Sequence, residues 1–197
     1  MDKYHYTLDE LRREFGMYKE IPAKYEEEIL TALSHYPELK DEQIHFVLAS
    51  AGAMPYSTKL TFSSYFGPKN KRIYTITILE RADFPESEAI IKHLNRKMRI
   101  GVLGHELGHV LQYKNCEPLK LLKNLVLYVI KPFKRKLERG ADKAAISHGL
   151  GEELLTHAEY IRLIPEYMNK RPELDTDYLK PEEIIYLMAH SDKIATA

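Results

Sequence analysis

The residues best suited to chemistry form a short His-Glu-x-x-His motif, in which His105 and His109 lie four positions apart and Glu106 follows the first histidine. Residues four apart share one face of a helix, so both imidazoles can reach a single metal ion. Glu106 can face the open position of that metal without binding it, and there it would take a proton from a metal-bound water. The spacing therefore predicts a site for one Zn²⁺ ion per chain.

A second pair of charged residues repeats this spacing further along the chain. Glu138 and Asp142 lie four apart in the motif Glu-x-x-Ala-Asp-x-x-Ala. One carboxylate can bind the metal, and the other can accept the free ring N–H of a ligand histidine, which fixes the imidazole tautomer. Two histidines, one carboxylate and a water make a catalytic zinc shell, whereas structural zinc sites are closed and often rich in cysteine. The chain has one cysteine, Cys116, which favours the catalytic kind of site.

Together the two motifs resemble those of the gluzincin metallopeptidases. The second motif is especially similar to that of the CAAX-prenyl proteases, the bacterial membrane heat-shock proteases and their small soluble relatives, the minigluzincins. The resemblance covers residues 43–150 by order of elements and is sharpest at the two motifs. It implies a zincin-like fold and a zinc-dependent endopeptidase that hydrolyses peptide bonds in peptide or protein substrates.

The resemblance also implies a role for each motif residue. It makes His105, His109 and Glu138 the zinc ligands, Glu106 the general base and acid, and Asp142 the partner of a ligand histidine. It further implies that an edge strand, within residues 58–66 or 72–79, pairs with extended substrate.

Three residues outside the motifs are candidates for stabilising the oxyanion of a tetrahedral intermediate: His148, His157 and Tyr160. Their spacing does not select among them. Two alternatives to a peptidase acting in solution stay open. One is a zinc-binding regulatory or interaction module without turnover, for which Glu106 would have no use. The other is a protease associated with a membrane surface.

The elements around these motifs indicate an α+β fold, with a small three-stranded sheet early in the chain and a mostly helical remainder that carries the metal site. Runs of β-forming residues predict strands over 43–49, 58–66 and 72–79, the last two forming a hairpin. Helical spacing predicts helices over the following ranges: 8–15, 22–36, 89–99, 102–114, 118–130, 133–147, 152–164 and 181–189.

The length of 197 residues fits a single domain. We expect an N-terminal helical layer over 1–39, a catalytic core over 43–150 and C-terminal helices over 151–197. Thr7 and Glu10 have the spacing of a capping box at the start of the first helix.

Charge and composition limit the partners. Lys and Arg number 29, and Asp and Glu also number 29, so the net charge of zero argues against a nucleic-acid partner. A single cysteine and a polar N-terminus predict a cytoplasmic protein. Residues 118–136 mix apolar with basic side chains. They favour a helix packed on the metal-binding helix over one lying on an anionic membrane surface.

Overall fold

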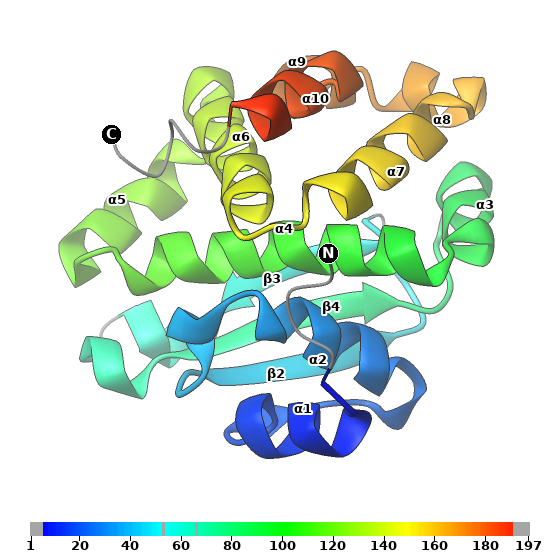
Figure 1. The fold of residues 1–197 in the computed structure, drawn as a ribbon. Helices are drawn as coiled ribbons and strands as arrows, with labels where there is room; N and C mark the ends of the chain where they lie inside the picture. The colour runs from blue at the N-terminus through cyan, green and yellow to red at the C-terminus, as the bar shows by residue number, and fades with distance from the viewer. Residues whose placement is uncertain (1–5, 53, 66, 191–197) are drawn as a thin grey trace.

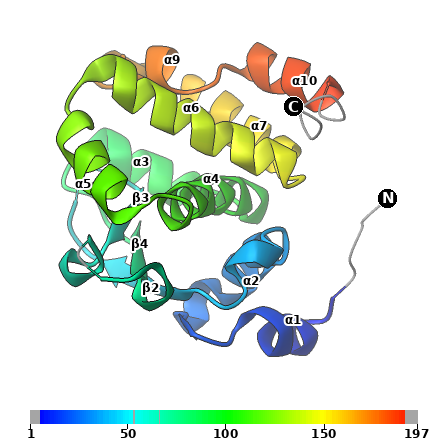
Figure 2. The same ribbon diagram turned by 90° about the vertical axis from the view of Figure 1, so that its left-hand side faces the viewer.

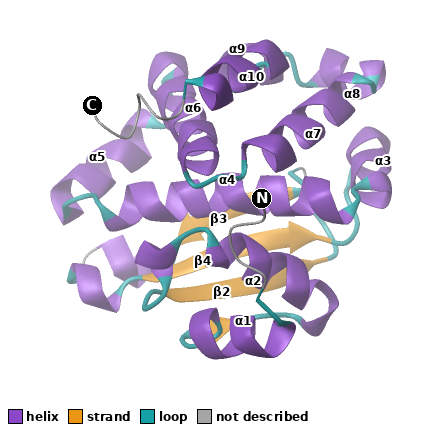
Figure 3. Ribbon diagram, viewed as in Figure 1, coloured by secondary structure: helices purple, strands orange, loops and turns teal. Residues whose placement is uncertain are grey.

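The computed structural model describes residues 6–52, 54–65 and 67–190. In this part of the chain, a small mixed sheet lies beside helices that make up most of the remaining residues (Figure 1; Figure 3). The α+β architecture expected from the sequence is therefore confirmed.

The sheet contains four strands among the described residues, not the three predicted. They are β1 (Lys19–Glu20), β2 (Gln43–Ala49), β3 (Tyr56–Leu60) and β4 (Ile73–Leu79). Their order is β1-β2-β4-β3. β1 and β2 are parallel, as are β2 and β4, while β3 and β4 form the expected antiparallel hairpin. The additional strand, β1, has only two residues, too few to produce a periodic pattern in the sequence.

The strand predicted over 58–66 is shorter than expected at its C-terminal end. β3 ends at Leu60, and the chain then forms a 3-10 turn over Phe62–Tyr65. Ser64 fixes this turn, because its hydroxyl accepts a hydrogen bond from the backbone N–H of Ile73 at 2.9 Å.

Two helices near the N-terminus pack against each other, and the second of them also packs against the helix that carries the first motif. α1 (Leu8–Phe15) begins at the predicted capping box, in which Thr7 and Glu10 exchange side chain-to-backbone hydrogen bonds. α2 (Glu26–Ser34) has three glutamates in its first turn, which complement the helix dipole. Its apolar face is buried in the core.

The central helix, α4 (Arg96–Lys114), carries the His-Glu-x-x-His motif and is longer than predicted. α3 (Pro85–His93) precedes it, so the break between the two helices falls at residues 94–95 and not at 100–101. Asn95 sets this boundary, because its side-chain oxygen accepts the backbone N–H of Met98 at 2.9 Å. Viewed end-on in Figure 2, α4 lies between the sheet and α2 on one side and α6 (Lys131–Ser147) and α7 (Gly151–Arg162) on the other. All its side chains from 100 to 110 are buried.

Glycines allow α6 and α7 to approach α4 closely. A Cβ at Gly101 would lie 2.4 Å from the backbone of Glu153 on α7. A Cβ at Gly108 would lie 2.8 Å from the carbonyl oxygen of Ala141 on α6. Gly108 therefore lets the helix with the second motif pack directly against the first motif.

The remaining helices differ from the predictions mainly at their ends. α5 (Pro118–Leu127) ends before the predicted residue 130, and α6 begins with Pro132 in its first turn, a position that proline favours. Two short helices, α8 and α9, were not predicted. The bounds are α8 (Pro165–Lys170), α9 (Leu174–Asp177) and α10 (Pro181–Ala189). None of the helices among the described residues combines the length and apolar character needed to cross a bilayer.

Candidate metal centre

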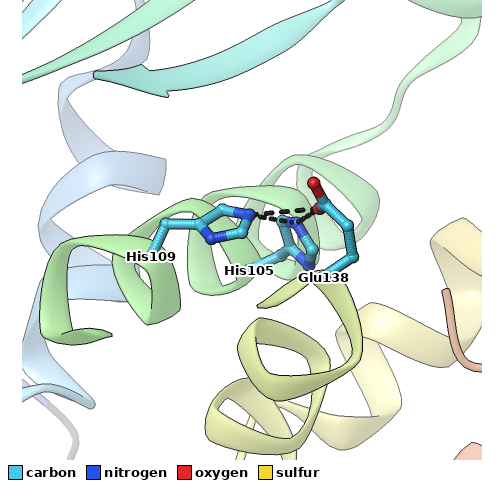
Figure 4. Close-up of side chains that lie close together, drawn as sticks. All are labelled: His105, His109 and Glu138. Carbon is cyan, nitrogen blue, oxygen red and sulfur yellow. Dashed lines mark hydrogen bonds and ion pairs between the residues drawn. The ribbon is translucent and has the colours of Figure 1, made fainter. Parts of the chain in front are cut away.

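Three buried side chains from two helices converge at the centre of the molecule (Figure 4). α4 supplies His105 and His109, and α6 supplies Glu138. The Nε2 atom of His109 lies 3.1 Å from Nε2 of His105 and 3.2 Å from Oε2 of Glu138. Nε2 of His105 lies 3.3 Å from the same oxygen.

The three atoms, Nε2 of His105, Nε2 of His109 and Oε2 of Glu138, form a triangle whose sides have the length expected around a bound metal ion. Ligands bound about 2.0–2.1 Å from a tetrahedral zinc ion lie about 3.4 Å apart, close to the observed separations. The triangle also brings two imidazole nitrogens and a carboxylate oxygen together away from water, where only a proton or a cation can relieve their repulsion. The group can therefore hold a metal ion.

Asp142 takes the position of a partner to a ligand histidine. Its Oδ1 accepts a hydrogen bond from Nδ1 of His105 at 2.7 Å, and its Oδ2 accepts the backbone N–H of Leu179 at 2.8 Å. A proton held on Nδ1 leaves Nε2 free to face Glu138. Burial alone would lower the pKa of His105, but the hydrogen bond and charge of Asp142 raise that pKa well above its usual value. Of the two carboxylates left open by the spacing, Glu138 is the one that faces both Nε2 atoms.

The other two ligand candidates also have partners. Nδ1 of His109 lies 3.4 Å from Oε1 of Gln112. The hydroxyl of Tyr128, at the C-terminal end of α5, donates to Oε1 of Glu138 at 2.7 Å. Burial would raise the pKa of Glu138, but the neighbouring rings of His105 and His109 bring that pKa well below its usual value. The carboxylate is therefore ionised at neutral pH.

Glu106 lies beside the ligands but is held by the sheet. The hydroxyl of Thr58 on β3 donates to its Oε2 at 2.6 Å. The carboxylate is buried and borders two hollows that both reach His105. It does not belong to the group of three that can hold the metal. Glu106 thus has the separate position that a general base requires.

The larger hollow, called here the strand-side cleft, runs along β3. Every residue of β3 lines it, together with His109, Glu138 and residues of α5. β3 is the last strand of the sheet, whereas β4 is paired on both sides. Of the two segments expected to supply an edge strand, only the first one therefore has an unpaired edge.

The second hollow, called here the inner pocket, lies between α4 and α7 and is mostly apolar. Val102, Leu154 and Ile161 contribute to its walls, and His157 lies among them. Burial lowers the pKa of His157 to about 3, so its imidazole is neutral at neutral pH.

Of the three oxyanion candidates, His157 lines one of these two hollows, the inner pocket. The ring of His148 instead faces Oε1 of Glu38 through its Nε2 at 2.9 Å. The hydroxyl of Tyr160 donates to the carbonyl oxygen of Ala89 at 3.4 Å. Neither His148 nor Tyr160 is among the residues that line the strand-side cleft or the inner pocket.

Tyr178 is a site residue that sequence reasoning missed. It follows α9 directly, lines both hollows, and its ring centre lies 5.6 Å from that of His105. Burial raises its pKa well above the usual value, so its hydroxyl stays protonated. Neither Tyr178 nor Tyr128 belongs to a motif, and only the folded chain brings them to the centre.

Comparison of the chain with protein-family models, with curated proteins and with solved structures found no match.

Proposed function

We propose that the chain is a zinc-dependent endopeptidase of the gluzincin type. One observation carries the proposal: His105, His109 and Glu138 meet at distances that suit one zinc ion, while Glu106 stands beside them without joining the group. This combination has two histidines, a carboxylate and a separate base, which are the components of a catalytic zinc site.

The bound zinc would polarise the scissile carbonyl and activate the attacking water. Glu106 would accept the proton of that water and pass it to the leaving amine. Thr58 would orient Glu106 for both transfers through its short hydrogen bond to Oε2. The protonated hydroxyl of Tyr178 and the neutral ring of His157 would supply hydrogen-bond donors for the developing oxyanion.

The unpaired edge of β3 supports a peptide as the substrate. Backbone groups at a strand edge can pair with an extended chain, and a chain bound in the strand-side cleft would lie beside Glu106. The inner pocket is apolar and opens at the same carboxylate, so it would take an apolar side chain of the substrate.

A metal-binding module without turnover is the competing interpretation, and Glu106→Gln separates the two. The zinc-loaded chain should cleave members of a diverse peptide mixture, with products followed by mass spectrometry. Glu106→Gln should lower cleavage at least 100-fold, as expected for loss of a general base, while leaving bound zinc unchanged. Glu159→Gln, an exposed carboxylate on α7, is the matched control and should cleave normally.

Two results would contradict the proposal. One is a zinc-loaded chain that cleaves no peptide in the mixture. The other is a Glu106→Gln variant that cleaves as fast as the unaltered chain, because any activity would then come from elsewhere.

A further inference from the structure

We propose that α5 and the turn after it dock on an anionic lipid surface and that the docked protein presents its strand-side cleft to that surface. The apolar part of the protein's docking face, called here the α5 patch, consists of Leu119, Val126, Val129 and Ile130.

The α5 patch is unusually exposed for its composition. Leu119 is 80% exposed, Val126 is 70% exposed and Val129 is 85% exposed. Leu119 and Val126 lie seven positions apart, on the same face of α5, and the other two follow where that helix ends. Single exposed apolar residues are ordinary, but several gathered on one helix face and its adjoining turn indicate an interaction site.

The side chains around the α5 patch are basic, which favours a negatively charged partner. Residues 118–136 contain six basic side chains and no acidic one, although the whole chain has no net charge. Two of them pair with the carboxylate of Asp177. Nζ of Lys134 lies 3.8 Å from its Oδ2, and Nε of Arg135 lies 3.6 Å from its Oδ1. The other four, which are Lys120, Lys123, Lys131 and Lys136, are exposed and form no ion pair with the described residues.

An exposed apolar face flanked by unpaired lysines is complementary to a bilayer surface that carries anionic headgroups. The apolar side chains can enter the boundary between headgroups and acyl chains, while the lysines contact the headgroups. A nucleic acid would match the lysines but would leave the apolar side chains exposed to water.

The docked helix is also a wall of the strand-side cleft. Leu121 and Asn124 line the cleft from α5, and Tyr128 donates a hydrogen bond to Glu138. Docking would therefore bring the opening of the cleft close to the lipid surface, where extended segments of membrane-associated proteins would be the substrates. This last step rests on the proposed peptidase function, whereas the docking itself does not.

The test measures co-sedimentation of the full chain with vesicles of phosphatidylcholine, with and without phosphatidylserine, at low and at near-physiological salt. We expect binding to the anionic vesicles that weakens as salt rises. The double variant Lys120→Gln/Lys123→Gln should bind about 25-fold more weakly, because each basic side chain near such a surface contributes about fivefold. Leu119→Ser/Val126→Ser should bind at least tenfold more weakly. Leu163→Ser, 78% exposed at the end of α7, is the matched control and should bind normally.

Absence of sedimentation with anionic vesicles at low salt would overturn the proposal. It would also be overturned if the chain formed a dimer that Leu119→Ser/Val126→Ser abolishes, with no vesicle binding, because the patch would then contact a second copy. Binding is measured in parallel with Glu106→Gln and with metal-free protein, which should bind as the unaltered chain does. A failure of docking and a failure of the peptidase proposal are thereby distinguished.

Discussion

Replacing Asp142 with asparagine tests the carboxylate that supports the candidate metal centre from beside His105. Asp142 is only 3% exposed and accepts two hydrogen bonds, one from the ring of His105 and one from the backbone of Leu179. Both of its partners are donors. Asparagine offers one accepting oxygen and one donating NH₂ group, so it cannot satisfy both partners.

The size of the effect follows from this mismatch. If the NH₂ group of Asn faces His105, the histidine must move its proton to Nε2, the nitrogen that faces Glu138, and that proton then blocks metal binding. If the NH₂ group faces Leu179, a buried backbone donor loses its partner, which costs about 1–3 kcal/mol. Loss of a partner to a metal ligand commonly weakens metal binding 10–100-fold. We expect Asp142→Asn to weaken zinc binding by nearly 100-fold, which is a loss of about 2.7 kcal/mol in the free energy of binding.

The assay is competition for zinc between the protein and a chromophoric chelator at neutral pH. Asp177→Asn is the matched control, because Asp177 is also buried, at 4% exposure, but pairs with side chains of α6 outside the metal centre. This control should bind zinc within about threefold of the unaltered chain, since its carboxylate touches no ligand. Equal zinc affinity in Asp142→Asn and the unaltered chain would refute the assigned role of Asp142.

Three further substitutions test the packing of α4 on α6, the hydrogen bond from Tyr128 to Glu138 and the ion pair of Arg139 with Glu183. Gly108→Ala should lower the free energy of unfolding by about 1–2 kcal/mol in chemical denaturation, because the new Cβ would meet the backbone of Ala141, and this outweighs the gain in helix propensity. Tyr128→Phe removes the hydrogen bond to the ligand carboxylate and should weaken zinc binding about tenfold in the chelator assay. Arg139 lowers the pKa of Glu183 to about 2, so their pair stabilises the fold above pH 4.5, the usual value, and that stabilisation disappears as the pH falls to about 2. Because the carboxylate of Glu183 is more than one-third exposed, Glu183→Gln should cost about 1 kcal/mol at neutral pH and nothing near pH 2, measured by denaturation at both pH values.

Local signals in the sequence were sufficient for several elements. The capping box at Thr7 fixes the start of α1, and the proline at residue 181 marks the first turn of α10, so both helices have the predicted bounds. The four-residue spacings were equally informative. Residues four positions apart lie on the same face of a helix, so the neighbouring positions of His105 and His109 could be predicted from the sequence alone.

Other features depend on contacts that no local pattern encodes. Residues 89–99 and 102–114 read as two separate helices, yet α4 is continuous from Arg96 and is buried throughout residues 100–110, across the predicted break. Tyr128 and Tyr178 reach the centre from a helix end and a loop, and only packing of the surrounding helices places them there. The same packing holds His148 away from the centre, against Glu38, although its distance along the chain from Glu138 made it a reasonable candidate.

Zinc content per chain shows whether the group of His105, His109 and Glu138 holds a metal ion. Elemental analysis would compare the unaltered chain with Glu106→Gln and Glu138→Gln, each supplied with zinc at neutral pH. We expect about one zinc per chain in the unaltered protein and in Glu106→Gln, and a strong loss in Glu138→Gln, because Glu138, unlike Glu106, belongs to the group that can hold a metal ion. No zinc in the unaltered protein, or equal loss in both variants, would contradict this prediction.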